Sequence, residues 1–129
     1  MHHREAIRTD SAPPALGPYS QAIVAGDLVF TAGQLGGDPR SGQLPEGIEA
    51  QTLQALRNIA SVLEAAGAGW KDVVKTTVFL ADMTDFAAFN AVYAEVLEEP
   101  FPARSTVEAA ALPKGARIEI DAIAVRSHR

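Results

Sequence analysis

The sequence predicts an α+β protein in which one mixed sheet carries two helices on a single face. Three observations support this class. Hydrophobic residues make up 47% and charged residues 21% of the 129 residues, as in ordinary folded proteins. Two segments with apolar residues at helical spacing alternate with segments rich in β-branched residues. Two such helices cannot cover both faces of a sheet, so the other face is expected to meet water or another chain.

The length and composition restrict the classes of protein and site. One domain spanning residues 1–129 is expected. The net charge of -5 gives no basic surface for nucleic acid, and the absence of cysteine excludes disulfides and thiolate ligands. His2, His3 and His128 lie near the chain ends and are not expected to take part in chemistry. No signal-peptide pattern or membrane-length apolar run appears, so a cytoplasmic location is expected.

The expected elements follow the order β-β-α-β-α-β-β. Residues 5–8 could form an additional short strand, and the turn-rich segment SAPPALGP follows it. Two β-type runs, at 19–24 and 28–32, flank a Gly-Asp pair and predict a hairpin. The segment GGDPRSGQLPEG has no apolar period and predicts a loop.

The apolar spacing becomes helical at Ile48 and stays so to near Gly67, which predicts the first helix. Residues 73–80 are rich in β-branched side chains and predict a buried strand. The second helix is expected to begin at Asp82 or Thr84, both suitable N-caps, and to end before the prolines at 100 and 102. The expected apolar stripes are Ile48, Thr52, Leu56, Ile59 and Leu63 in the first helix, away from Gln51, Gln54, Arg57, Asn58 and Glu64, and Phe86, Phe89, Tyr93 and Leu97 in the second.

The C-terminal stretch FPARSTVEAAALPKGARIEIDAIAV predicts a hairpin of two strands around the turn LPKG. Alternation places Arg104, Thr106 and Glu108 on one face of the first strand, and Glu119 and Asp121 on one face of the second. If the two strands pair, Arg104 can approach Glu119. A structural ion pair is the simpler interpretation. The alternative is an arginine that grips a substrate carboxylate beside a glutamate that deprotonates a water.

Two further side chains are ambiguous from the residues alone. Asn90 lies on the apolar stripe of the second helix and needs a hydrogen-bond partner, which could be the backbone, water or a ligand. Tyr19 could lie in the core or at a cleft, and the core is the simpler interpretation. The glycines of TAGQLGG follow no phosphate-binding spacing, so a phosphate site is not expected.

Taken together, GPYSQA, FTAGQL, LEAAGAGWKDVVKTTVFLADMTDFAAFNAVY and FPARSTVEAAALPKGARIEIDAIA resemble the motifs of the RidA (YjgF/YER057c/UK114) family of imine deaminases. The resemblance covers nearly the whole chain. It implies a chorismate-mutase-like protomer in a homotrimer, with the helices outside, a barrel-like core and active-site clefts between subunits. It also implies hydrolysis of reactive enamines and imines, such as 2-aminoacrylate and its imine tautomer, to 2-oxo acids and ammonia without a cofactor.

The resemblance also implies roles for individual residues. Arg104 would pair with the substrate carboxylate, and Glu119 would orient and deprotonate the attacking water. Tyr19, Gly33 and Asn90 would line the pocket.

The chain departs from many family members at two pocket positions. Ala32 stands where many members have serine, so it offers no hydroxyl, and Thr106 stands where many have cysteine. Thr31 cannot replace the missing serine, because its side chain is expected to point to the opposite face. The alternative functions are a non-catalytic binder of small carboxylic acids and a ribonuclease or translation inhibitor. Chorismate mutase activity rests on fold analogy alone.

Overall fold

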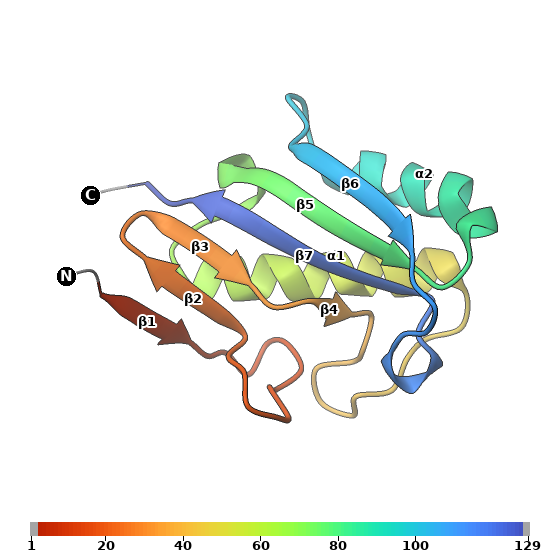
Figure 1. Cartoon of the computed structure of the whole chain (residues 1–129), viewed down its shortest axis with the longest axis horizontal. Coiled ribbons are helices and arrows are strands. Elements are labelled where there is room, and N and C mark those ends of the chain that lie inside the picture. Colours follow the sequence, from red (N-terminus) through yellow and green to blue (C-terminus); the bar gives the residue numbers. More distant parts are fainter. Residues whose placement is uncertain (1–2, 128–129) are drawn as a thin grey trace.

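The computed structural model describes residues 3–127, in which two helices pack on one face of a seven-stranded sheet (Figure 1). The strand order is β1-β2-β3-β7-β5-β6, and β4 also pairs with β7. Strands β5 and β6 are parallel, and the other pairs are antiparallel. The α+β class with a mixed sheet is therefore confirmed. The elements are β1 (Arg4–Ile7), β2 (Ala22–Ala25), β3 (Leu28–Thr31), β4 (Gln34–Leu35), α1 (Ile48–Ala65), β5 (Val73–Leu80), α2 (Phe86–Val96), β6 (Ala103–Glu108) and β7 (Ile118–Val125), with short 3-10 turns at Trp70–Asp72, Met83–Asp85 and Pro113–Gly115.

Local sequence signals explain most element boundaries. The β2–β3 hairpin turns at Gly26 and Asp27, and Gly26 has a φ of 62°, a conformation that glycine adopts without steric cost. The Asp82 side chain accepts a hydrogen bond from the Thr84 backbone N–H at 2.9 Å and caps the turn that leads into α2. The fold also contains the short strand β4, which the glycine-rich sequence around it did not predict. His2 and His128 lie outside the described residues, and His3 is exposed.

One apolar layer between the helices and the sheet forms the core. All five residues of the predicted α1 stripe are buried, as are Phe89, Tyr93 and Leu97 of the α2 region. Strand β7 alternates between buried and half-buried residues, with Ile118 and Ile120 facing the helices. Glu119 and Asp121 therefore face away from the helices, as the alternation predicted.

The predicted C-terminal hairpin is wrong. Strand β5 lies between β6 and β7, because α2 connects β5 to β6 as a crossover that leaves β6 parallel to β5 at the sheet edge (Figure 1). The register pairs Arg104 with Thr76 and, on the other side of β5, Glu119 with Phe79. The strand order thus separates the two charged residues that the hairpin was expected to bring together.

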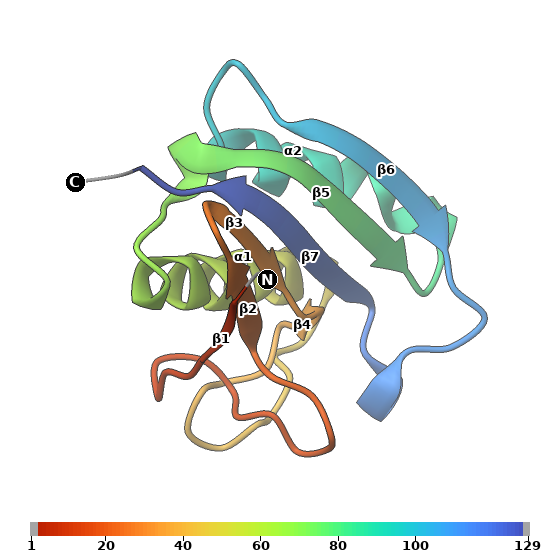
Figure 2. The ribbon, with the colours of Figure 1, turned by 60° about the vertical axis from the view of Figure 1, so that its left-hand side comes forward.

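The sheet face opposite the helices is uncovered within the described chain, as predicted (Figure 2). Four large apolar side chains are exposed there by 40 to 44%: Leu28, Phe30, Val107 and Val125. They belong to three strands, and the register places Leu28 opposite Val125. Exposed apolar side chains of this kind are typical of interaction surfaces.

Two polar residues of α1 lie in the core, contrary to the prediction from the helical wheel. Asn58 is fully buried, and its Nδ2 donates to the carbonyl oxygens of Leu35 at 3.0 Å and Gly37 at 2.9 Å. Gln51 is also buried and donates to the Pro45 carbonyl at 2.9 Å. Both side chains donate hydrogen bonds to backbone carbonyl groups of β4 and the loop that follows it, which would otherwise lack these donors. Among the described residues, no helix is long and apolar enough to cross a membrane.

Candidate functional site

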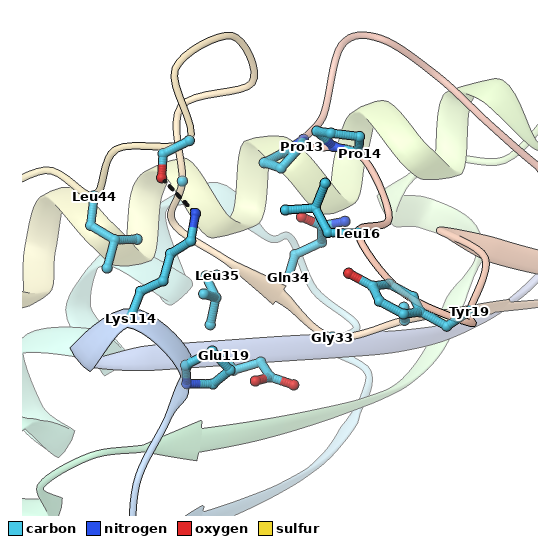
Figure 3. A pocket seen from close by; sticks show the side chains of 14 residues that line it. Pro13, Pro14, Leu16, Tyr19, Gly33, Gln34, Leu35, Leu44, Lys114 and Glu119 are labelled. Carbon is cyan, nitrogen blue, oxygen red and sulfur yellow. Dashed lines mark hydrogen bonds between the residues drawn. The ribbon is translucent and has the colours of Figure 1, made fainter.

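A cavity of about 520 Å³ lies where the turn-rich segment 11–18, the β3–β4 connection and the start of β7 meet (Figure 3). The carboxylate of Glu119 and the hydroxyl of Tyr19 point toward the same space in this view. Much of the remaining wall is apolar, which favours a ligand with a hydrocarbon part beside its polar groups. The lining residues used below are Tyr19, Ala32, Gly33, Lys114 and Glu119, and the apolar wall includes Pro13, Pro14, Leu16, Leu35, Leu44 and Pro113.

Glu119 is the ionisable group at the floor of this cavity. It is half-buried on the helix-free face of β7, and within residues 3–127 its carboxylate accepts no hydrogen bond. Burial raises the pKa of Glu119 above its ordinary value, and the nearby Asp121 carboxylate raises it further. A carboxylate with a raised pKa and free lone pairs is suited to accept a proton.

Gly33 lies so close to Glu119 that any other residue at this position would force the Glu119 side chain to move. A Cβ atom on Gly33 would overlap the carboxylate group of Glu119. The absence of a side chain at position 33 therefore leaves the space that the carboxylate occupies. Ala32, the neighbouring residue, also lines the cavity and offers no hydroxyl there.

The interpretation of Tyr19 as a core residue is wrong. Its side chain is 56% exposed and lines the cavity (Figure 3). The sequence did not predict the apolar wall or Lys114, although the turns SAPPALGP and LPKG contain Pro13, Pro14, Leu16, Pro113 and Lys114. Lys114 has a φ of 60°, which is unusual for a residue other than glycine, and its Nζ donates to the Gly42 carbonyl at 3.3 Å across the cavity mouth.

Arg104 lies in a different environment, against α2. Its guanidinium carbon is 4.8 Å from the ring centre of Tyr93, 5.1 Å from that of Phe89 and 5.6 Å from that of Phe86. Its Nη1 donates to Asn90 Oδ1 at 2.8 Å, so the partner that Asn90 needs is Arg104. Arg104 and Tyr93 also line a second cavity, of about 320 Å³, with Ala94, Phe101 and Pro102.

Arg104 and Glu119 do not form an ion pair within one chain. Arg104 is in register with Thr76, which is buried beneath the helices, whereas Glu119 belongs to the uncovered face. The two side chains therefore start from opposite faces of the same sheet. The direction of the pKa shift agrees, because a guanidinium beside Glu119 would lower its pKa, and the pKa is raised. The predicted site residues thus form two groups, one with Tyr19, Ala32, Gly33 and Glu119 and one with Asn90 and Arg104.

The two threonines near these groups differ in their partners. Thr31 Oγ1 accepts a hydrogen bond from the Ala122 backbone N–H at 3.0 Å. The hydroxyl therefore bonds to a neighbouring strand, in line with the expectation that it points away from the pocket. Thr106 Oγ1 is enclosed by protein atoms and has no hydrogen-bond partner among the described residues. No group of three or more metal-ligating side chains is present in the part of the chain that the structure describes.

Comparisons with known proteins give a consistent result. The model of the endoribonuclease L-PSP family matches residues 9–126. A goat (Capra hircus) protein named 2-iminobutanoate/2-iminopropanoate deaminase is 52% identical over 124 residues, which cover 95% of this chain and 90% of that protein. The crystal structure of RidA from Psychrobacter superposes with a TM-score of 0.92 at 49% identity and covers 94% of this chain and 98% of that one. The crystal structure of E. coli TdcF with bound serine has a TM-score of 0.91 at 41% identity, with 95% and 99% covered.

The matched residues include β2 to β7 and both helices, and with them every side chain of the two groups described above. The chain belongs to the endoribonuclease L-PSP family, which is the RidA (YjgF/YER057c/UK114) family that its motifs resemble.

Proposed function

We propose that the protein is an imine deaminase that hydrolyses 2-iminobutanoate, 2-iminopropanoate and related reactive imines to 2-oxo acids and ammonia. The observation that carries the proposal is the half-buried Glu119, whose carboxylate lies in an open cavity with a raised pKa and no hydrogen-bond donor among the described residues. The name of the goat relative supports the same reaction. The apolar cavity wall would accept the methyl or ethyl group of these imines.

The complete site is proposed to form between two copies of the chain. Arg104 and Glu119 lie on opposite faces of one sheet, so a small imino acid cannot contact both within a protomer. The exposed apolar face supplies a reason for association, and β6 places Arg104 at the sheet edge. We propose a homotrimer in which Arg104 and Asn90 of one subunit complete the Glu119 cavity of the next, in line with the resemblance. The cytoplasmic location stays a prediction.

In the proposed reaction, Arg104 holds the imine's carboxylate, because its planar guanidinium can bind a carboxylate with two N–H donors. Glu119 takes a proton from a water molecule as the water oxygen bonds to the imine carbon, and the imine nitrogen takes a proton from solvent. The resulting carbinolamine then breaks its carbon–nitrogen bond. Glu119 returns its proton to the departing amine, the hydroxyl releases its proton to solvent as the carbon–oxygen double bond forms, and ammonia and the 2-oxo acid leave. Positioned proton transfer of this kind is worth about 10² to 10⁴ in rate.

A direct assay tests the proposal. A dehydratase that acts on serine or threonine releases the enamine and imine in solution, and the purified chain should increase the rate of 2-oxo acid formation above the spontaneous rate. A protein that binds 2-oxobutanoate but leaves this rate unchanged would instead be a carboxylic-acid binder. Salt-sensitive cleavage of RNA that persists in Arg104→Ala would indicate the ribonuclease alternative.

Gly33→Ala is expected to lower kcat roughly 10- to 100-fold, because a methyl group at this position must displace the Glu119 carboxylate from its place. The thermal midpoint should change little, since the carboxylate is the end of a flexible side chain. Gly69→Ala is the matched control, because a Cβ there meets nothing within 4 Å. Equal losses of activity in the two variants would contradict the assigned role of Gly33.

The midpoint of the acid limb in the pH profile of kcat/KM should lie above pH 4.5, the ordinary pKa of a glutamate, because the pKa of Glu119 is raised. A base works only when it is deprotonated, so activity is lost as the pH falls through the raised value. Asp121→Asn removes the second cause of the shift and should move the limb to lower pH. The measurement is kcat/KM from about pH 4 to 8, corrected for spontaneous hydrolysis. A limb that Asp121→Asn leaves in place would show that another group titrates.

A further inference from the structure

The aromatic side chains around Arg104 form a continuous stripe of α2. Phe86, Phe89 and Tyr93 are spaced by three and four residues, and their rings meet edge to face, with centres 6.0 Å and 5.5 Å apart along the stripe. All three ring faces lie within cation–π range of the guanidinium. The stripe thus surrounds a cation that is paired with no carboxylate among the described residues.

Tyr93 differs from the two phenylalanines because its hydroxyl has a fixed partner. Tyr93 Oη and Thr76 Oγ1 share a buried hydrogen bond of 2.8 Å, and the two residues are 4% and 0% exposed. Thr76 is also the register partner of Arg104 on the neighbouring strand. The three residues therefore contact one another in turn. Arg104 pairs with Thr76 through the β5–β6 ladder, Thr76 bonds to the Tyr93 hydroxyl, and the Tyr93 ring face contacts the Arg104 guanidinium.

Two contacts restrict the position of the Arg104 guanidinium. The Tyr93 hydroxyl end cannot shift sideways without breaking a buried hydrogen bond, and the Tyr93 ring is the closest of the three aromatic faces to the guanidinium. Asn90 holds one nitrogen from the side. The remaining N–H donors of Arg104 have no acceptor among residues 3–127 and are available to a ligand carboxylate.

We propose that Tyr93, held by Thr76, is a positioning residue that orients Arg104 for the substrate carboxylate. The inference rests on the proposed function of Arg104 as the carboxylate-binding group. Because a carboxylate is held equally in the ground state and the transition state, loss of this orientation should raise KM and leave kcat nearly unchanged.

The central variant is the pair Thr76→Val with Tyr93→Phe, which removes both hydroxyl groups and leaves neither partner unsatisfied in the core. Its thermal midpoint should stay close to that of the wild type, because both partners are replaced by apolar groups of similar shape. KM for the imine and the dissociation constant for 2-oxobutanoate should each rise about three- to ten-fold, with kcat within about two-fold. A double variant with wild-type KM and wild-type 2-oxobutanoate binding would overturn the inference.

A second comparison tests whether Tyr93 acts through Arg104. In an Arg104→Ala background, adding the same pair of changes should not weaken 2-oxobutanoate binding further, since there is no guanidinium left to orient. A further loss of equal size would show a general structural role and would overturn the inference. Trp70→Phe, an aromatic change in the same core without contact to Arg104, serves as the control.

The binding measurement separates this inference from the proposed reaction. A chain that binds 2-oxobutanoate by calorimetry but does not hydrolyse imines would refute the deaminase proposal, and the two comparisons above would still decide the role of Tyr93. A wild-type chain that binds no 2-oxobutanoate would overturn the inference, because Arg104 would then not be a carboxylate site.

Discussion

Glu119→Gln is expected to lower kcat for imine hydrolysis by about 10² to 10⁴, which is the usual range for a positioned general base. The amide has nearly the shape of the carboxylate but cannot take a proton from water. Binding of 2-oxobutanoate should change little, because the proposed carboxylate-binding group is Arg104. The measurement is the rate of 2-oxo acid release at saturating imine flux, together with the dissociation constant for the product.

The loss cannot be attributed to unfolding, and the sign of the pKa shift explains why. Because the folded-state pKa of Glu119 is raised, the ionised carboxylate weakens the folded state at pH values above that pKa. Removing the charge should therefore leave the thermal midpoint at neutral pH unchanged or slightly higher. Asp121→Asn is the matched control: it removes a carboxylate two residues away on the same face, and it should retain kcat to within a few-fold at neutral pH. An active Glu119→Gln protein would refute the deaminase proposal in its present form.

The side-chain faces of the strands could be predicted from the sequence because alternation is a local property. The last strand alternates Ile118, Glu119, Ile120 and Asp121, and its burial follows the same order. The buried stripe of α1 was predicted for the same reason. Strand order is not local, since it depends on which crossover packs back onto the sheet. The predicted contact between Arg104 and Glu119 is wrong for this reason. The alternation within each strand was predicted correctly, but β6 and β7 are not neighbours, because β5 lies between them.

Other residues escaped prediction because their partners are distant in the sequence. Asn58 is polar and was placed away from the core, but its amide is needed by carbonyl groups more than 20 residues earlier. Tyr19 was assigned to the core because tyrosine usually buries its ring, whereas here the surrounding proline-rich turn forms a cavity wall around it. The close approach of Gly33 to Glu119 likewise joins positions that only the folded sheet brings together.

Arg104→Ala and Glu119→Gln should each be nearly inactive alone, and activity should return when the two variants are assembled together. In the proposed cyclic trimer, each site takes Glu119 from one subunit and Arg104 from the next. A site between an Arg104→Ala subunit that supplies Glu119 and a Glu119→Gln subunit that supplies Arg104 has both native side chains. Every mixed trimer, whatever its composition, has one such site out of three, so the mixed assemblies should have about one third of wild-type activity.

Co-expression of the two variants with different affinity tags, followed by sequential purification on both tags, isolates the mixed assemblies for this measurement. A site contained within one chain would show no recovery, because every chain in the mixture lacks one of the two residues. Co-assembly of the wild type with the double variant gives a second, independent value. In the whole mixture, without separation of the assemblies, sites between subunits would retain about one quarter of wild-type activity at equal amounts, whereas sites within one chain would retain about one half. The opposite faces occupied by Arg104 and Glu119 favour the first outcome, since no single protomer can present both side chains to one small molecule.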